Sequence, residues 1–292
     1  MNNIALFEST GMPEAIKWAE HAAHTLIAAG ASCYAAPELL DKFEPGLRNL
    51  IKICTYDEYE KYADAMISFG GDGTILGAAR VLINTNIPIM GVNVGKLGFL
   101  AEYPVESMDS SIKDLLEGNF RIVDRTMLET TIDGEKIFAL NDFVIEKKDT
   151  SSMITCDSFA NGSFIGSFRA DGIVVTTPTG STAYSLSCGG PIIAPSAEVL
   201  CITPISPHSL TIRPIVVPDN NEIEMKVISR TGDALFVADG QEQRALKTGD
   251  RIKITKSEAR VRLIKPNNSS YYDLLRNKLL WGVNVYKSET ED

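Results

Sequence analysis

The sequence is poor in the residues that build metal centres and disulfide frameworks. Its 292 residues include three histidines and five cysteines. The cysteines are odd in number, none stands in a C-x-x-C pair, and no histidine lies at a metal-ligand spacing from them. The sequence therefore supports neither a disulfide framework nor a zinc site.

An excess of basic residues is also missing. The chain carries 28 Lys and Arg against 38 Asp and Glu, a formal net charge of −10. A nucleic-acid surface needs clustered Lys and Arg, so we expect no nucleic-acid partner and a small ligand instead. An anionic ligand would have to be held by backbone N–H groups, helix N-termini or a few cations, because the net charge repels it.

Long hydrophobic runs are absent as well. No segment approaches the length that crosses a membrane, and the first residues lack the basic flank and apolar run of a signal peptide. We expect a cytoplasmic protein without a membrane partner.

The first hundred residues alternate short apolar runs with helix-like stretches, a pattern typical of a parallel α/β domain. The expected strands are residues 4–7, 65–69 and 87–94, and the expected helices are residues 14–29, 75–83 and 107–117. From about residue 121 the segments become shorter, richer in Thr, Val and Ile, and predict an antiparallel β domain. Its expected strands include residues 127–132, 143–146, 173–177, 222–228 and 251–255.

A glycine-rich loop joins a buried strand to a helix at residues 70–74. Its members are Gly70, Gly71, Asp72, Gly73 and Thr74. Glycines let the backbone approach a phosphate, and the helix that follows points its first N–H groups at the anion. A carboxylate in such a loop suits metal coordination beside phosphate or proton abstraction from a hydroxyl. The alternative is a tight turn in which Asp72 caps the helix.

Two familiar phosphate motifs do not fit. The dinucleotide fingerprint fails because Leu76 stands where its third glycine should be, and residues 91–97 are one residue too short for a Walker A loop and lack its hydroxyl. A different kind of kinase becomes the better interpretation of the loop.

Residues 177–191 gather hydroxyls, glycines and an aromatic directly after a strand. Ser and Thr at a helix start can cap it and bind a ligand, and Tyr184 offers a flat face to a base. The alternative is a polar turn with a well-capped helix. No G-x-S-x-G motif occurs, so a serine hydrolase has little support.

The pair Asn141-Asp142 stands at the expected end of a strand, and it offers donors and acceptors that suit a diol or an adenine edge. The alternative is an Asx turn between Leu140 and Phe143.

Taken together, these motifs resemble those of the NAD kinases. The shared segments are residues 70–74, Asn141-Asp142, residues 171–191, residues 207–210 before Arg213-Pro214, and Asp239-Gly240-Gln241. The resemblance covers the chain from about residue 60 onward. Diacylglycerol-type lipid kinases and phosphofructokinases carry similar glycine-aspartate loops, so only residues 177–191 separate the families.

The resemblance implies a Rossmann-like α/β domain over residues 1–120, a β-rich, sandwich-like domain over residues 121–270, and a segment, residues 271–292, that returns to the first domain. The aspartate matching Asp72 is the proton acceptor in that family, and the loop around it contacts phosphate. Positions matching the family's NAD contacts are Asp72, Gly73, Asn141, Asp142, Arg169, Asp171, Thr182, Ala183, Tyr184, Ser185, Leu186, Ser187 and Gln241. His208 either lies near the transferred phosphate or is structural.

The implied activity is transfer of the γ-phosphoryl group of ATP to the 2′-hydroxyl of the adenosine ribose of NAD, giving NADP and ADP, with Mg²⁺ as the metal ion. Inorganic polyphosphate could replace ATP, and the family's habit is a homodimer or homotetramer. The competing functions are a lipid or sugar kinase of the same superfamily and a non-catalytic NAD(P)-binding regulator. A lipid kinase should show a basic or apolar membrane face, and a regulator would not need a carboxylate in the phosphate loop.

Overall fold

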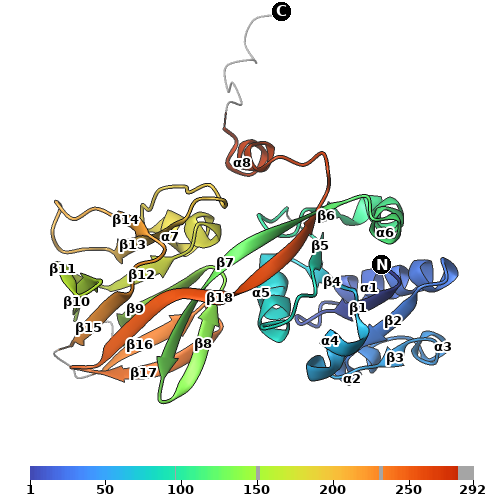
Figure 1. Cartoon of the computed structure of the whole chain (residues 1–292), viewed down its shortest axis with the longest axis horizontal. Helices are drawn as coiled ribbons and strands as arrows, with labels where there is room; N and C mark the ends of the chain where they lie inside the picture. Colours follow the sequence, from blue (N-terminus) through green and yellow to red (C-terminus); the bar gives the residue numbers. More distant parts are fainter. Residues whose placement is uncertain (96, 149–151, 230–232, 282–292) are drawn as a thin grey trace, which may run out of the picture. The chain divides into compact units, whose positions relative to one another are not determined.

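The computed structural model describes residues 1–95, 97–148, 152–229 and 233–281. The chain divides into two compact units, which are described separately (Figure 1). The first unit joins Met1–Val123 with Arg262–Asp292, and the second is Asp124–Val261. The part of the expected 271–292 segment that follows Trp281 lies outside the described residues.

The first unit is built on a parallel sheet with the strand order β3-β2-β1-β4-β5. Its strands are β1 (Asn3–Phe7), β2 (Ser32–Ala35), β3 (Lys52–Ile53), β4 (Ala65–Gly70), β5 (Ile89–Asn93) and the short β6 (Tyr103–Pro104), and the end of β18 (Arg251–Lys265) pairs with β5. The chain proceeds outward from β1 in one direction and then from β4 in the other. Doubly wound sheets bind ligands beyond the carboxyl ends of their strands at such a reversal, and β4 ends there at Gly70.

The first unit also contains helices, several of which pack on this sheet. They are α1 (Pro13–Ala28), α2 (Pro37–Leu40), α3 (Pro45–Arg48), α4 (Tyr59–Tyr62), α5 (Asp72–Val81), α6 (Met108–Glu117) and α8 (Tyr271–Leu279), with 3₁₀ turns at Tyr56–Glu58 and Val105–Ser107. Helix α1 begins at Pro13, whose missing N–H is not needed there, and buries small alanines and Leu26 against the sheet. Helix α6 ends at Gly118, whose φ of 78° suits a left-handed C-cap, as predicted.

The second unit packs two antiparallel layers around one core. The first layer is a six-stranded sheet with the order β14-β13-β12-β9-β16-β17. Its strands are β9 (Asp142–Lys147), β12 (Gly172–Thr176), β13 (Val199–Ile205), β14 (Ile215–Pro218), β16 (Asp233–Ala238) and β17 (Glu242–Lys247). The other layer is built from β7 (Arg121–Ile132), β8 (Glu135–Ala139), β10 (Ile154–Ala160), β11 (Ser163–Ala170), β15 (Ile223–Ile228) and most of β18. This arrangement confirms the prediction that an α/β domain is followed by a β-rich domain.

Strand alternation gives the six-stranded sheet one face that enters the core and an opposite face that mixes apolar side chains, such as Val144, Val174 and Val237, with carboxyl groups. On β9, Phe143 and Ile145 enter the core between the layers, whereas Asp142, Val144 and Glu146 point to the opposite face. A 3₁₀ turn (Thr179–Thr182) and α7 (Tyr184–Ser187) follow β12.

Two expectations about the elements were wrong. Asp142 begins β9 rather than ending a strand, and β18 continues far past the expected residues 251–255 to Lys265. Within the described residues, none of the helices combines the length and apolar character that crossing a bilayer requires.

Candidate functional site

The glycine-aspartate loop forms the turn from β4 into α5. Gly70 has a φ of 152°, and a Cβ there would lie 2.2 Å from Thr74 Oγ1, so only glycine fits. Gly71 occupies the N-cap position, and a Cβ at Gly71 or Gly73 would meet no atom within 4 Å. The start of α5 is therefore open to an approaching group, and first-turn N–H groups lie where an anion is favoured.

Asp72 does not cap its own helix, so that alternative is wrong. Its Oδ2 accepts the N–H of Phe99 at 2.8 Å, and its Oδ1 accepts those of Leu100 and Ala101 at 2.9 and 3.1 Å. The loop lies so close that a Cβ at Gly98 would come within 1.9 Å of Oδ1. A carboxylate offers about four acceptor directions, so Oδ2, with one donor, is the oxygen with acceptor capacity left.

The hydroxyl of Thr74 lies inside the first turn of α5. It is buried and has no hydrogen-bond partner within the described part of the chain. Buried hydroxyls normally have a hydrogen-bond partner, so the Thr74 hydroxyl could bond to a ligand that enters the loop.

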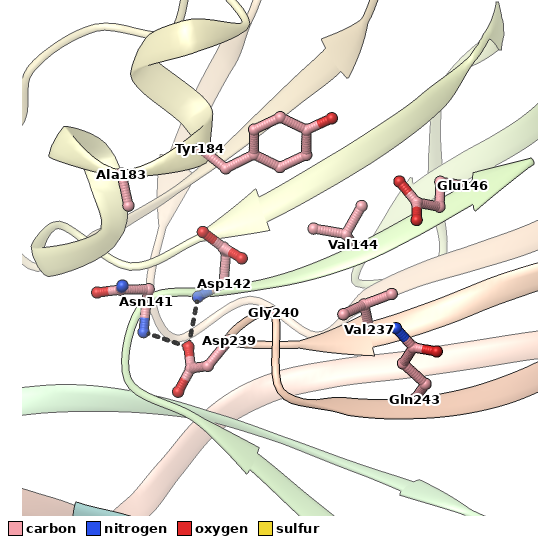
Figure 2. Close-up of a pocket in the computed structure, with 10 residues that line it drawn as sticks. All are labelled: Asn141, Asp142, Val144, Glu146, Ala183, Tyr184, Val237, Asp239, Gly240 and Gln243. Carbon is pink, nitrogen blue, oxygen red and sulfur yellow. Dashed lines mark hydrogen bonds between the residues drawn. The ribbon is translucent and has the colours of Figure 1, made fainter. Parts of the chain in front are cut away.

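A cavity of about 390 Å³ lies on the outward face of the six-stranded sheet in the second unit. It is lined by Asn141, Asp142, Val144, Glu146, Ala183, Tyr184, Val237, Asp239, Gly240 and Gln243. Figure 2 shows β9 and β16 forming its floor, with Tyr184 opposite Asp142 and Val144. Its volume falls in the range of small-molecule sites.

Asp142 supplies the most buried charge-bearing group of this cavity. The residue is 3% exposed, and no group among the described residues hydrogen-bonds to its carboxyl, which points toward Tyr184 and away from Asp239 (Figure 2). Burial, followed by the charge of Asp239, raises the pKa of Asp142 to about 7. Burial likewise raises the pKa of Glu146. A ligand group that donates hydrogen bonds would meet an unsatisfied acceptor here.

Asp239 fixes the loop that carries Asp142. Its carboxylate accepts the N–H groups of Leu140, Asn141 and Asp142 at 2.9, 2.8 and 3.1 Å, and Figure 2 shows the last two of these bonds. Three N–H groups on one carboxylate form a charge-assisted clamp. The Asn141-Asp142 pair is thus held through its backbone rather than by an Asx turn of its own side chains.

Residues at the end of β12 and directly after it hold the same loop through its carbonyl groups. Thr176 Oγ1 donates to the Asn141 carbonyl at 2.9 Å, and Thr177 Oγ1 donates to the Leu140 carbonyl at 2.6 Å. A Cβ on Gly180 would lie 2.2 Å from the Asn141 carbonyl oxygen. The glycines and threonines of residues 177–191 therefore shape the cavity wall.

The predicted contacts at residues 182–187 lie partly in the cavity, partly in the interior and, at Ser187, on the exposed surface. Ala183 and the half-exposed Tyr184 line the cavity. Thr182 bonds the Thr179 carbonyl, and the buried Ser185 bonds Thr203 Oγ1 at 2.9 Å. Leu186 and Ser187 do not line the cavity.

The other predicted residues lie outside the cavity lining. Asp171 precedes β12 and pairs with Lys147 at 2.6 Å. The exposed Arg169 and His208 are neighbours, since the His208 N–H donates to the Arg169 carbonyl at 2.9 Å. Gln241 is exposed in the turn after β16.

The lining also contains residues that the sequence did not point to, namely Val144, Glu146, Val237 and Gln243. Asp239 and Gly240 line it too; they belong to the shared segment 239–241, but only Gln241 of that segment was predicted as a contact. The period-2 alternation from Asp142 would have placed Val144 and Glu146 on its face. No local pattern reveals that Asp239 accepts the N–H groups of residues 140–142, because these partners are distant in sequence.

Among the described residues, no group of three His, Cys, Asp or Glu side chains could hold a metal ion. Asp72, the carboxylate within the phosphate loop, already accepts three N–H groups. The described residues therefore do not fit a Mg²⁺ site built from protein side chains alone.

Comparisons with known proteins agree across the chain. The family descriptions "ATP-NAD kinase N-terminal domain" and "ATP-NAD kinase C-terminal domain" match residues 12–120 and 140–266. An NAD kinase of Cytophaga hutchinsonii is 41% identical over 226 residues, which are 76% of this chain and 77% of that protein.

Solved structures share the fold. Yeast NADH kinase complexed with NADH has a TM-score of 0.89 at 23% identity, covering 100% of this chain and 90% of that one. An NAD kinase from Archaeoglobus fulgidus in complex with ATP has a TM-score of 0.76 at 25% identity, covering 95% and 98%.

Proposed function

The chain belongs to the NAD kinase family, and we propose that it transfers the γ-phosphoryl group of ATP to the 2′-hydroxyl of the adenosine ribose of NAD. The geometry of Asp72 carries the chemical part of this proposal. The relatives of this chain at about 41% identity are NAD kinases. This similarity disfavours a lipid kinase, a sugar kinase or a non-catalytic regulator.

In the proposed reaction, the 2′-oxygen attacks the γ-phosphorus while the bond from that phosphorus to the bridging oxygen of ADP breaks. The hydroxyl proton passes to Asp72 Oδ2, the carboxylate oxygen with a single N–H donor. Oδ1, with two donors, keeps the carboxylate in place. The open start of α5 receives the phosphate, and placement supplies most of the rate.

The cavity of the second unit takes part of the dinucleotide in this proposal. Tyr184 stacks on an adenine, and Asp142 accepts a hydrogen bond from the ligand. Asn141, Ala183 and Asp239 shape the wall. The exposed Arg169, Ser187 and Gln241 and the partly buried Asp171 are further contacts carried over from the family resemblance, and His208 is a candidate phosphate contact.

ATP is the proposed donor, as the complex of the Archaeoglobus fulgidus relative suggests, with polyphosphate as a second donor to be tested. Because the described residues do not fit a resident magnesium site, we treat Mg²⁺ as part of the nucleotide substrate. A homodimer or homotetramer and a cytoplasmic location complete the proposal.

The decisive experiment compares the wild type with Asp72→Asn in an assay of NAD, ATP and Mg²⁺ coupled to an NADP-specific dehydrogenase. Losing a general base should lower kcat by about 10²- to 10⁴-fold, with NAD affinity by calorimetry nearly unchanged. Asp64→Asn is the matched control, because Asp64 also accepts backbone N–H groups, from Asn2 and Asn3. An Asp72→Asn enzyme that kept more than about a tenth of kcat would remove Asp72 from the role of base.

A further inference from the structure

Lys265 is the largest fully buried cationic side chain in the described part of the chain, and the proposed chemistry does not use it directly. It is 1% exposed and stands at the end of β18, whose residues Leu263 and Ile264 pair with β5. A buried ammonium group is costly unless hydrogen bonds and an opposite charge compensate it. Lys265 Nζ donates to Glu102 Oε1 at 2.6 Å and to the Leu100 carbonyl at 2.8 Å.

The Leu100 carbonyl belongs to the peptide group whose N–H is that of Ala101. This N–H donates to Asp72 Oδ1 at 3.1 Å. One peptide group therefore connects the Lys265 ammonium to the Asp72 carboxylate, with the cation on its oxygen and the anion on its N–H. Hydrogen bonds arranged in such a chain polarise and strengthen one another.

From this arrangement we infer that Lys265 is a positioning residue for Asp72. It fixes the Leu100–Ala101 peptide so that two N–H groups hold Oδ1, which leaves Oδ2 directed at the substrate hydroxyl. Glu102 balances the charge of Lys265 and orients it. The inference rests on the proposed role of Asp72 as the base.

The surroundings make the loop rigid enough for this role. A Cβ at Gly98 would overlap Asp72, and Gly91 of β5 lies so close to Ala101 that a Cβ there would approach its Cα at 3.0 Å. The ammonium of Lys278 in α8 stands 5.0 Å from the centre of the Phe99 ring. The bond from Lys265 Nζ, by contrast, reaches the Leu100–Ala101 peptide itself, which carries an Oδ1 donor.

The test separates positioning from stability. Lys265→Met leaves Glu102 without its buried partner and should lower the melting temperature. The double variant Lys265→Met/Glu102→Met removes both charges and should recover much of that loss, because a buried ion pair can be replaced by apolar groups. If Lys265 positions Asp72, the double variant still loses about tenfold to a hundredfold in kcat, while KM for NAD and for ATP stay within about threefold.

Lys42→Met is the matched control. Lys42 Nζ lies 3.2 Å from Glu8, whose side chain is fully buried, and the hydrogen bonds of this pair go to Thr10 and Gly11 rather than to residues 98–101 within the described part of the chain. The Lys42→Met enzyme should be less stable than the wild type and should keep kcat within about twofold.

A double variant that regains stability together with wild-type kcat overturns the inference. Should Asp72→Asn retain kcat, the proposed base itself is wrong, whatever Lys265 does. If Asp72→Asn loses kcat and the double variant does not, only the role of Lys265 fails.

Discussion

Asp239 accepts the backbone N–H of Asp142 and, by its negative charge, helps to raise the pKa of the Asp142 carboxyl. One residue thus fixes the position of the other and makes it harder to ionise. Burial contributes more to the shift than Asp239 does, and together they bring the pKa of Asp142 to about 7. The acceptor in the cavity therefore titrates close to neutral pH.

Stability should depend on pH through Asp142. The unfolded carboxyl loses its proton near pH ~3.9 and the folded one near pH 7, so between these values the folded state binds more protons. The contribution of Asp142 to the free energy of unfolding is fully present below about pH 4 and is lost as the pH rises to about 7. Urea unfolding across this range should show wild-type stability falling relative to Asp142→Asn, by up to about 1.4 kcal/mol per pH unit. Parallel curves for the two proteins would mean that Asp142 titrates normally.

Asp239→Asn should loosen the loop at residues 140–142. An amide cannot accept all three N–H groups, and a lost bond to a charged acceptor costs about 1.5–3 kcal/mol. The pKa of Asp142, followed by NMR, should fall but stay above its ordinary value, because burial remains. Asp250→Asn is the control, since Asp250 accepts one N–H, from Lys247, in an exposed turn. Equal destabilisation by both changes would contradict the clamp.

Asp142→Ala should impair NAD binding more than chemistry. At pH 8 the wild-type carboxyl is ionised and accepts from the ligand, so its loss should raise KM for NAD about tenfold or more. KM for ATP should barely change. Initial rates with each substrate varied in turn provide the measurement, and equal increases for both substrates would indicate a general disturbance of the loop.

Tyr184→Ala should weaken dinucleotide binding by about 1–3 kcal/mol, the scale of stacking a base on an aromatic ring. Tyr184 is 41% exposed and faces the cavity, so the change removes little core packing. Phe164→Ala, which alters another exposed aromatic of the same unit, is the control. Calorimetry showing unchanged NAD affinity for the folded Tyr184→Ala protein would return Tyr184 to a packing role.

Local signals were enough to predict several of the elements. Pro13 and Gly118 mark the ends of helices because proline and glycine act on the backbone directly. The apolar run before Gly70 predicts a strand covered on both faces, and β4 is buried throughout. The length of β18 was missed, because residues such as Ser257 and Glu258 interrupt its alternation and only pairing with other strands carries it onward.

The site was less predictable because its contacts are distant in sequence. Asp239 stands 97 to 99 positions from the three N–H groups that it accepts, and no pattern near residue 239 reveals them. Ser185 looked like a ligand contact, yet its hydroxyl bonds Thr203 of β13 in the interior. Whether a hydroxyl faces a cavity or a neighbouring strand depends on packing that the sequence does not display.

The clamp on residues 140–142 links the cavity to cooperative unfolding. These amide protons are donated to a carboxylate just beyond the end of β16, so we expect their hydrogen exchange to be slow while β16 stays in the six-stranded sheet. The cavity wall and the sheet should then be protected together. A nucleotide that selects the assembled wall should slow amide exchange throughout the strands of this sheet, well beyond the residues it touches.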